Sequence, residues 1–76
     1  MNKLANDELK SLLLAGLQSL PDRERAILAL HYSDGIRFNE IAAAMEVTES
    51  RISQLHSRAL ERLKAFIKRS ETGDRD

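Results

Sequence analysis

Apolar residues recur every three or four positions along most of this chain, and this spacing constrains the fold more than any other feature. In the first segment it produces one helical face that consists of Leu9, Leu12, Leu13, Leu17 and Leu20. Leu14 falls outside that face. Strict alternation of apolar and polar residues, which is typical of a half-buried strand, is absent. The pattern therefore predicts an all-α fold.

Three breaks divide the pattern into four predicted helices. Ser19-Leu20-Pro21 ends the first, because proline suits a helix start and disfavours helix in the residue before it. Asp34-Gly35 ends a second helix over about residues 21–33, since glycine commonly follows a helix in the left-handed conformation. Glu46-Val47-Thr48 separates a two-turn helix from a long one, which Thr48 can cap. The long helix carries a narrow apolar stripe of Ile52, Leu55, Ala59, Leu63 and Phe66.

The chain has 76 residues, enough for one small domain and too few for two. It contains no cysteine, so helix packing or a partner must stabilise its small core. No apolar run reaches the length of a membrane span, and the first residues lack the pattern of a secretory signal, so we expect a cytoplasmic protein. We predict one four-helix domain without a wing over residues 1–69, and a disordered polar tail over 70–76.

Basic residues gather in the last predicted helix. The whole chain is neutral, with 12 basic and 12 acidic residues, which argues against a strongly electrostatic, free-standing nucleic-acid binder. Residues 48–69, however, carry six Lys or Arg and two Glu, a net charge of +4. Cations near the helix C-terminus also complement the helix dipole, which accounts for about half of this charge. Arg51 lies in the first turn, where the helix dipole disfavours a cation, so the dipole does not explain it and a functional role is favoured.

The last two predicted helices have the layout of a helix-turn-helix over about residues 38–67. In such a motif the N-terminal turns of the second helix enter the major groove of DNA. Gln54 can pair with adenine there, and Ser50 and Glu49 can reach base edges. Arg51 and Arg58 flank these residues, and Arg37, at the start of the preceding helix, can reach a phosphate. The same layout fits a small helical domain that binds no DNA, so spacing alone leaves both readings open.

The sequence offers no catalytic or metal-binding constellation. Its two histidines, His31 and His56, are far apart in sequence, and His56 lies beside the apolar stripe as a helix-face residue at the core edge. No nucleophile, base and orienting acid can be assembled. We therefore expect a protein that is not an enzyme and that uses no metal, cofactor or small-molecule substrate.

Four blocks, in this order, resemble region 4 of bacterial sigma factors: Leu20-Pro21-Asp22-Arg23-Glu24-Arg25, Glu40-Ile41-Ala42, Val47 to Ser57, and Ala59 to Leu63. The run from Glu49 to Ser57 is most similar to the flagellar and sporulation branch. The resemblance covers about residues 20–67. Two positions depart from the common pattern: Arg37 replaces a threonine or asparagine cap, and Glu46 stands where such turns often carry glycine.

The resemblance implies a transcription-initiation module that recognises the minus-35 promoter element and docks on the β flap of RNA polymerase, and that in many members is captured by an anti-sigma factor. It implies base contacts from Glu49, Ser50 and Gln54 and DNA-backbone contacts from Arg51, Ser53 and Arg58. The complete predicted DNA-contacting set is Arg37, Thr48, Glu49, Ser50, Arg51, Ser53, Gln54, Ser57 and Arg58. Candidates for flap or anti-sigma contacts are Leu14, Leu17, Leu28 and Tyr32.

Two alternatives stay open from the sequence. A stand-alone, sigma-like interaction module would bind the flap or an anti-sigma factor without reading DNA, and the neutral net charge favours it. A LuxR-type output domain shares the pattern of the second helix and the Glu40-Ile41-Ala42 block, and would bind a palindromic site as a dimer. For the leading interpretation, the expected location is the bacterial cytoplasm, at the nucleoid.

Overall fold

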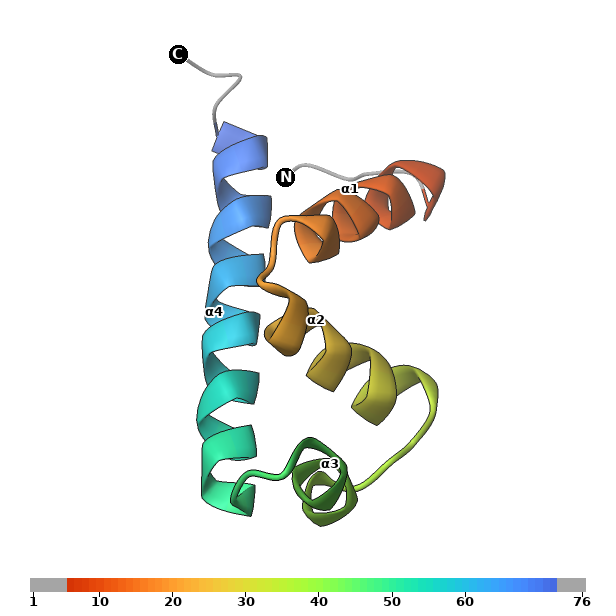
Figure 1. Ribbon diagram of the computed structural model, residues 1–76. Coiled ribbons are helices and arrows are strands. Elements are labelled where there is room, and N and C mark those ends of the chain that lie inside the picture. The colour runs from red at the N-terminus through yellow and green to blue at the C-terminus, as the bar shows by residue number, and fades with distance from the viewer. Residues whose placement is uncertain (1–5, 73–76) are drawn as a thin grey trace.

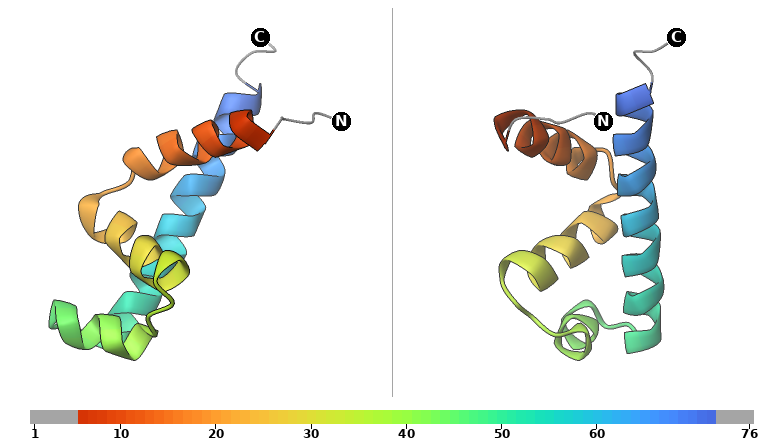
Figure 2. Two further views of the ribbon diagram at one scale, coloured as in Figure 1. Left: turned by 90° about the vertical axis from the view of Figure 1, so that its right-hand side faces the viewer. Right: turned by 180° about the vertical axis from the view of Figure 1, so that it is seen from behind.

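The computed structural model describes residues 6–72, which form four α-helices, as the spacing predicts. These are α1 (Asn6–Gln18), α2 (Asp22–Leu28), α3 (Phe38–Met45) and α4 (Glu49–Thr72), and a five-residue π-helix, η1 (Ala29–Ser33), continues α2. The described part of the chain contains no strand. α4 forms a long rod with the other helices stacked along it, α1 beside its C-terminal half and α3 at its N-terminal end (Figures 1 and 2). The all-α prediction is confirmed.

η1 is the element that the sequence pattern does not predict. We expected one regular helix over residues 21–33, but its last five residues widen into π-helix. Single π turns within helices often occur at functional sites. Beyond η1 the Ile36 N–H donates to the carbonyl oxygen of Leu30 at 3.0 Å, and Gly35 takes the left-handed conformation with φ of 71°. The predicted glycine stop is therefore confirmed, although the turn before it is not regular α-helix.

Two clusters of buried side chains hold α4 against the other helices. The first joins α2, α3 and the N-terminal half of α4, and it consists of Ile27, Ile41, Ala42, Ile52 and Leu55. The second consists of Leu20, Leu28 and Ala59. Ile27, Ile41 and Ile52 are fully buried, and each such side chain contributes about 1.5–3 kcal/mol to stability. The predicted stripe of α4 thus supplies part of both clusters, while Leu63 and Phe66 are half-buried.

α1 is more exposed than its leucine pattern suggests. Leu9 and Leu13, which we placed on its apolar face, are 41% and 36% exposed. Leu14 is 54% exposed, as its position outside that face predicts. α1 packs against α4 at Gly16, where an added Cβ would lie 2.5 Å from Cδ1 of Leu63. This close approach buries one narrow edge of α1 and leaves much of the apolar face uncovered.

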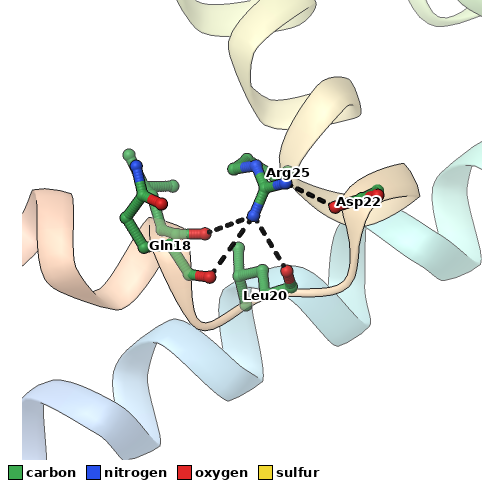
Figure 3. A network of polar contacts seen from close by, with 5 residues as sticks. Gln18, Leu20, Asp22 and Arg25 are labelled. Carbon is green, nitrogen blue, oxygen red and sulfur yellow. Dashed lines mark hydrogen bonds and ion pairs between the residues drawn. The ribbon is translucent and has the colours of Figure 1, made fainter.

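Arg25 holds the junction between α1 and α2 (Figure 3). Its Nη1 donates to the carbonyl oxygens of Leu17, Gln18 and Leu20, at 3.5, 3.3 and 3.1 Å, and its Nη2 pairs with the carboxylate of Asp22. α1 has no basic residue in its own last turn. The guanidinium of Arg25 therefore supplies the positive charge that complements the C-terminal end of the α1 dipole.

The C-terminal helix is long. α4 has 24 residues and extends to Thr72, three residues beyond Arg69, where we expected the domain to end. The remaining residues of the predicted tail, 73–76, lie outside the described part of the chain. Among the described helices, none combines the length and the apolar character that a membrane span requires.

Candidate nucleic-acid interface

A three-residue turn joins α3 to α4, as the helix-turn-helix layout requires. Glu46 takes the left-handed conformation, with φ of 60° and ψ of 44°. Its N–H donates to the Ala43 carbonyl at 3.3 Å, and the Val47 N–H donates to the Ala42 carbonyl at 3.0 Å. These two bonds make a Schellman motif, in which a residue other than glycine costs about 1 kcal/mol. Val47 packs against the first core cluster, so the turn has a fixed geometry without glycine.

Side chains cap the starts of both helices of the motif. Oγ1 of Thr48 accepts a hydrogen bond from the Arg51 N–H at 3.0 Å, which confirms the predicted cap of α4. The hydroxyl keeps its own hydrogen to donate. At α3, the Glu40 carboxylate accepts from the Arg37 N–H at 3.4 Å. This glutamate contact is typical of a capping box and compensates for the arginine that precedes the helix.

The outer face of α4 is polar and exposed at its N-terminal end. Eight of the nine predicted DNA-contacting residues lie in its cap and first three turns, and the ninth, Arg37, is exposed at the far end of α3. Gln54 and Ser50 are exposed on the side opposite the buried Ile52 and Leu55. Arg51 is half-buried, and its Nη1 donates to Oε1 of Gln54 at 3.4 Å. This contact orients the Gln54 amide while leaving its NH₂ group to donate.

Four rings meet where η1, α3 and α4 converge, and sequence reasoning did not foresee this. The hydroxyl of Tyr32 lies 2.7 Å from Nε2 of His56. Phe38 contacts both histidines, with its ring centroid 4.6 Å from His31 and 5.0 Å from His56. Burial, and secondarily the nearby His31, lower the pKa of His56 below its usual value. Helical spacing predicts that His56 lies at the core edge, but it does not predict the rings that reach it, His31 and Tyr32 from η1 and Phe38 from α3.

The four predicted partner-contacting residues line one groove, between α1, the α2–η1 segment and α4, with a volume of about 410 Å³. Leu14 and Tyr32 are 54% and 61% exposed, and Leu17 is half-buried. Leu28 is 5% exposed and belongs to the second core cluster, so it forms the floor of the groove. Leu60, which we did not single out, adds an exposed apolar side chain from α4. Its position just outside the buried stripe could have indicated this role.

A buried carboxylate on α2 pairs with an arginine on α4. The Glu24 side chain is 4% exposed, and Nε of Arg62 lies 3.1 Å from its Oε1 and 3.3 Å from its Oε2. Only Oε2 accepts a well-aligned hydrogen bond, so Oε1 is held by charge alone. Within residues 6–72, no three His, Asp or Glu side chains are grouped to hold a metal ion.

Comparison with known proteins decides the family. The model of "Sigma-70, region 4" matches residues 16–65, well over half of the chain. The chain belongs to the sigma-70 region 4 family. This match favours the sigma interpretation over the LuxR-type alternative. It also covers the turn and the exposed face of α4 described above.

Curated relatives agree with this assignment of the region 4 chain. It is 41% identical over 67 residues to RNA polymerase sigma factor FliA of Salmonella typhimurium and 39% identical to FliA of Escherichia coli K12. It is 33% identical to the RNA polymerase sigma-D factor of Bacillus subtilis. These alignments cover 88% of this chain but only 26–28% of each relative, so the chain spans about a quarter of their length. No solved structure matches it.

Proposed function

We propose that this region 4 chain recognises the minus-35 element of a bacterial promoter as the DNA-reading part of a sigma factor docked on the RNA polymerase β flap. The observation that carries this is the exposed face of α4, where Ser50 and Gln54 project from a capped helix that begins at a turn of fixed geometry. It is a binding module and not an enzyme, and it acts in the cytoplasm at the nucleoid.

The side chains at the N-terminal end of α4, together with Arg37 before α3, have distinct roles in this proposal. The Gln54 amide pairs with N6 and N7 of an adenine, and Glu49 accepts from N4 of a cytosine. Arg58 and Arg37 are exposed and reach phosphates on either side. With about three to five phosphate contacts and no net charge, the isolated chain binds DNA weakly, with a Kd of about 10⁻⁴ to 10⁻⁶ M at physiological salt.

Docking on polymerase compensates for this weak affinity. The groove lined by Leu14, Leu17, Tyr32 and Leu60 offers exposed apolar area for a segment of the flap. A tethered module reaches an effective concentration of about millimolar, which raises promoter occupancy without any further DNA contact. An anti-sigma factor that bound the same groove would compete with the flap and keep the module from the promoter.

Fluorescence anisotropy tests the proposal. The chain is titrated onto labelled promoter DNA of the flagellar type and onto a scrambled duplex, at low and at moderate salt, with and without a β-flap fragment. We expect preference for the promoter duplex and tighter binding when the flap is present. Equal binding to both duplexes at every salt concentration contradicts promoter recognition.

A matched pair of glutamine variants separates base reading from general effects. Gln54→Ala should lose about tenfold or more in promoter affinity, while binding to scrambled DNA stays the same, because one bidentate base contact is removed. Gln18→Ala removes an exposed amide at the end of α1, outside the predicted DNA-contacting set, and without the flap fragment should leave both affinities unchanged. Circular dichroism should show the same helicity for both variants. A fall in helicity in Gln54→Ala would instead make this residue structural.

The groove also supports a function of a second class, which is binding to another protein without recognition of DNA. Leu14, Tyr32 and Leu60 expose apolar surface, and the chain is neutral. Both features suit a stand-alone module that occupies the flap or titrates an anti-sigma factor. Flap binding without promoter preference at any salt concentration would favour this function.

A further inference from the structure

Arg51 differs from the other two predicted DNA-contacting arginines in where its guanidinium lies. Arg37 and Arg58 are exposed, whereas Arg51 is half-buried. Its Nη1 donates to Oε1 of Gln54 at 3.4 Å. The two residues are three positions apart on α4, so they lie about 60° apart around the helix and about 4.5 Å apart along its axis. The guanidinium therefore contacts the side chain that is proposed to read a base.

This contact determines which way round the Gln54 amide lies. An arginine side chain only donates hydrogen bonds, so the amide atom that faces it must be the oxygen. The NH₂ group of Gln54 therefore points away from Arg51. A rotation of the amide by about 180° would bring its NH₂ group against the guanidinium, where two donors meet and the hydrogen bond is lost. The arginine thus favours one of the two amide orientations.

The orientation of the amide matters because the two purines present different groups in the major groove. Adenine offers a donor at N6 beside the acceptor N7, whereas guanine offers two acceptors, O6 and N7. In the bidentate pair with adenine, the glutamine oxygen faces N6 and its NH₂ group faces N7. Guanine would bring O6 against the same oxygen. A glutamine that is free to flip can turn its NH₂ group toward O6 instead, so a held amide separates the two purines better than a free one.

We propose that Arg51 is a positioning residue, which holds the Gln54 amide in the orientation that selects adenine over guanine. This inference rests on the proposed function, and it differs from the DNA-backbone contact that the resemblance to sigma factors implied for Arg51. The amide oxygen has two lone pairs, so Oε1 accepts from Arg51 and from adenine N6 at the same time. The first turn of a helix disfavours a cation, which agrees with a role in base reading and not in helix stability.

Two other roles for Arg51 predict different results when it is removed. A phosphate contact contributes about 0.9 to the slope of log affinity against log salt concentration, whatever the DNA sequence. A direct base contact from an arginine favours guanine, through O6 and N7, so its loss would strengthen the preference for adenine. The loss of a positioning residue leaves the salt slope unchanged and weakens the preference for adenine. The salt slope and the purine preference together separate the three roles.

The test uses anisotropy titrations of the whole chain on promoter duplexes in which each A·T pair of the minus-35 element is replaced in turn by G·C. Gln54→Ala first identifies the pair that Gln54 reads, because this variant loses discrimination only there. At this pair we expect the wild-type chain to prefer adenine by about tenfold or more, and Arg51→Met to prefer it by about threefold or less. Circular dichroism should show the same helicity for every variant.

Two further variants complete the test over a series of salt concentrations. Arg58→Met is the matched control, since it removes an exposed arginine from the same helix; it should lower the salt slope by about 0.9 and weaken binding to both purine duplexes equally. Arg51→Met should leave the slope unchanged. The double variant Arg51→Met/Gln54→Ala should show the same purine preference as Gln54→Ala alone, because Arg51 acts only through the amide.

An unchanged or stronger preference for adenine in Arg51→Met, or a salt slope lowered by about 0.9 in that variant, would overturn the proposal. So would full discrimination by Gln54→Ala at every A·T pair.

Absence of promoter preference in the wild-type chain would count against the proposed function, and the amide orientation would then be judged in the free chain. NMR relaxation of the side-chain NH₂ groups compares Gln54 with Gln18, the other glutamine of the chain. We expect Gln54 to be the less mobile of the two in the wild-type chain and to become as mobile as Gln18 in Arg51→Met. Equal mobility of the two glutamines in the wild-type chain would overturn the positioning role.

Discussion

Replacing Arg62 by methionine tests how far α4 depends on its ion pair with Glu24. Methionine keeps the apolar stem of the side chain and removes the charge. Glu24 stays 4% exposed, and its carboxylate loses the cation that lies 3.1 Å away. Breaking a fully buried pair costs about 3–5 kcal/mol. Because the Arg62 side chain is 54% exposed, solvent already screens this pair, and we expect a loss of about 2 kcal/mol in the free energy of unfolding.

Thermal and urea unfolding at pH 7, followed by circular dichroism, measure this loss. For a domain of this size about 2 kcal/mol lowers the unfolding midpoint by roughly 8–16 °C. Lys64→Met removes an exposed cation from the same helix and should change stability by less than about 0.5 kcal/mol. The double variant Glu24→Met/Arg62→Met should regain most of the loss, because the unpaired buried charge is gone. A loss in Arg62→Met no larger than in Lys64→Met would refute the reasoning.

Substitutions at three further positions test the turn, the cap and the groove. Glu46→Gly should stabilise the chain by up to about 1 kcal/mol in urea unfolding, since glycine adopts the left-handed conformation without strain, and a destabilised variant would contradict this. Thr48→Ala should cost about 1 kcal/mol in the same assay, while Thr48→Asp should cost little because aspartate also caps; equal losses would contradict the cap. Leu14→Glu should abolish binding of the β-flap fragment in anisotropy and leave the unfolding midpoint nearly unchanged, because this side chain is 54% exposed. Retained flap binding would show that the groove is not the docking surface.

Local patterns predicted the helices and the helix-turn-helix. The cap at Thr48, the left-handed Gly35 and the buried positions of Ile52 and Leu55 follow from spacing and backbone preferences within a few residues. The exposure of Leu9 does not follow, because α1 meets α4 along one edge only. That contact depends on how segments more than 40 residues apart pack together, which no local period reports.

The candidate site likewise has parts that the sequence predicted and parts that it did not. The exposed face of α4 was predictable because Gln54 and Ser50 lie opposite the apolar stripe. The groove was predicted only through the resemblance to sigma factors, and Leu60 was missed although its position just outside the buried stripe could be read from the helical spacing. The ring cluster around His56 depends on η1, and no sequence pattern that we used distinguishes a π turn from an ordinary one.

α4 carries the buried stripe on one side and the face proposed to read DNA on the other. Substitutions at Ser50 or Gln54 leave the contacts of Ile52 and Leu55 in the core unchanged. Related chains can therefore diverge in promoter preference during evolution without first acquiring compensating changes in the core. A new specificity requires only that the buried side of the same helix stays as it is.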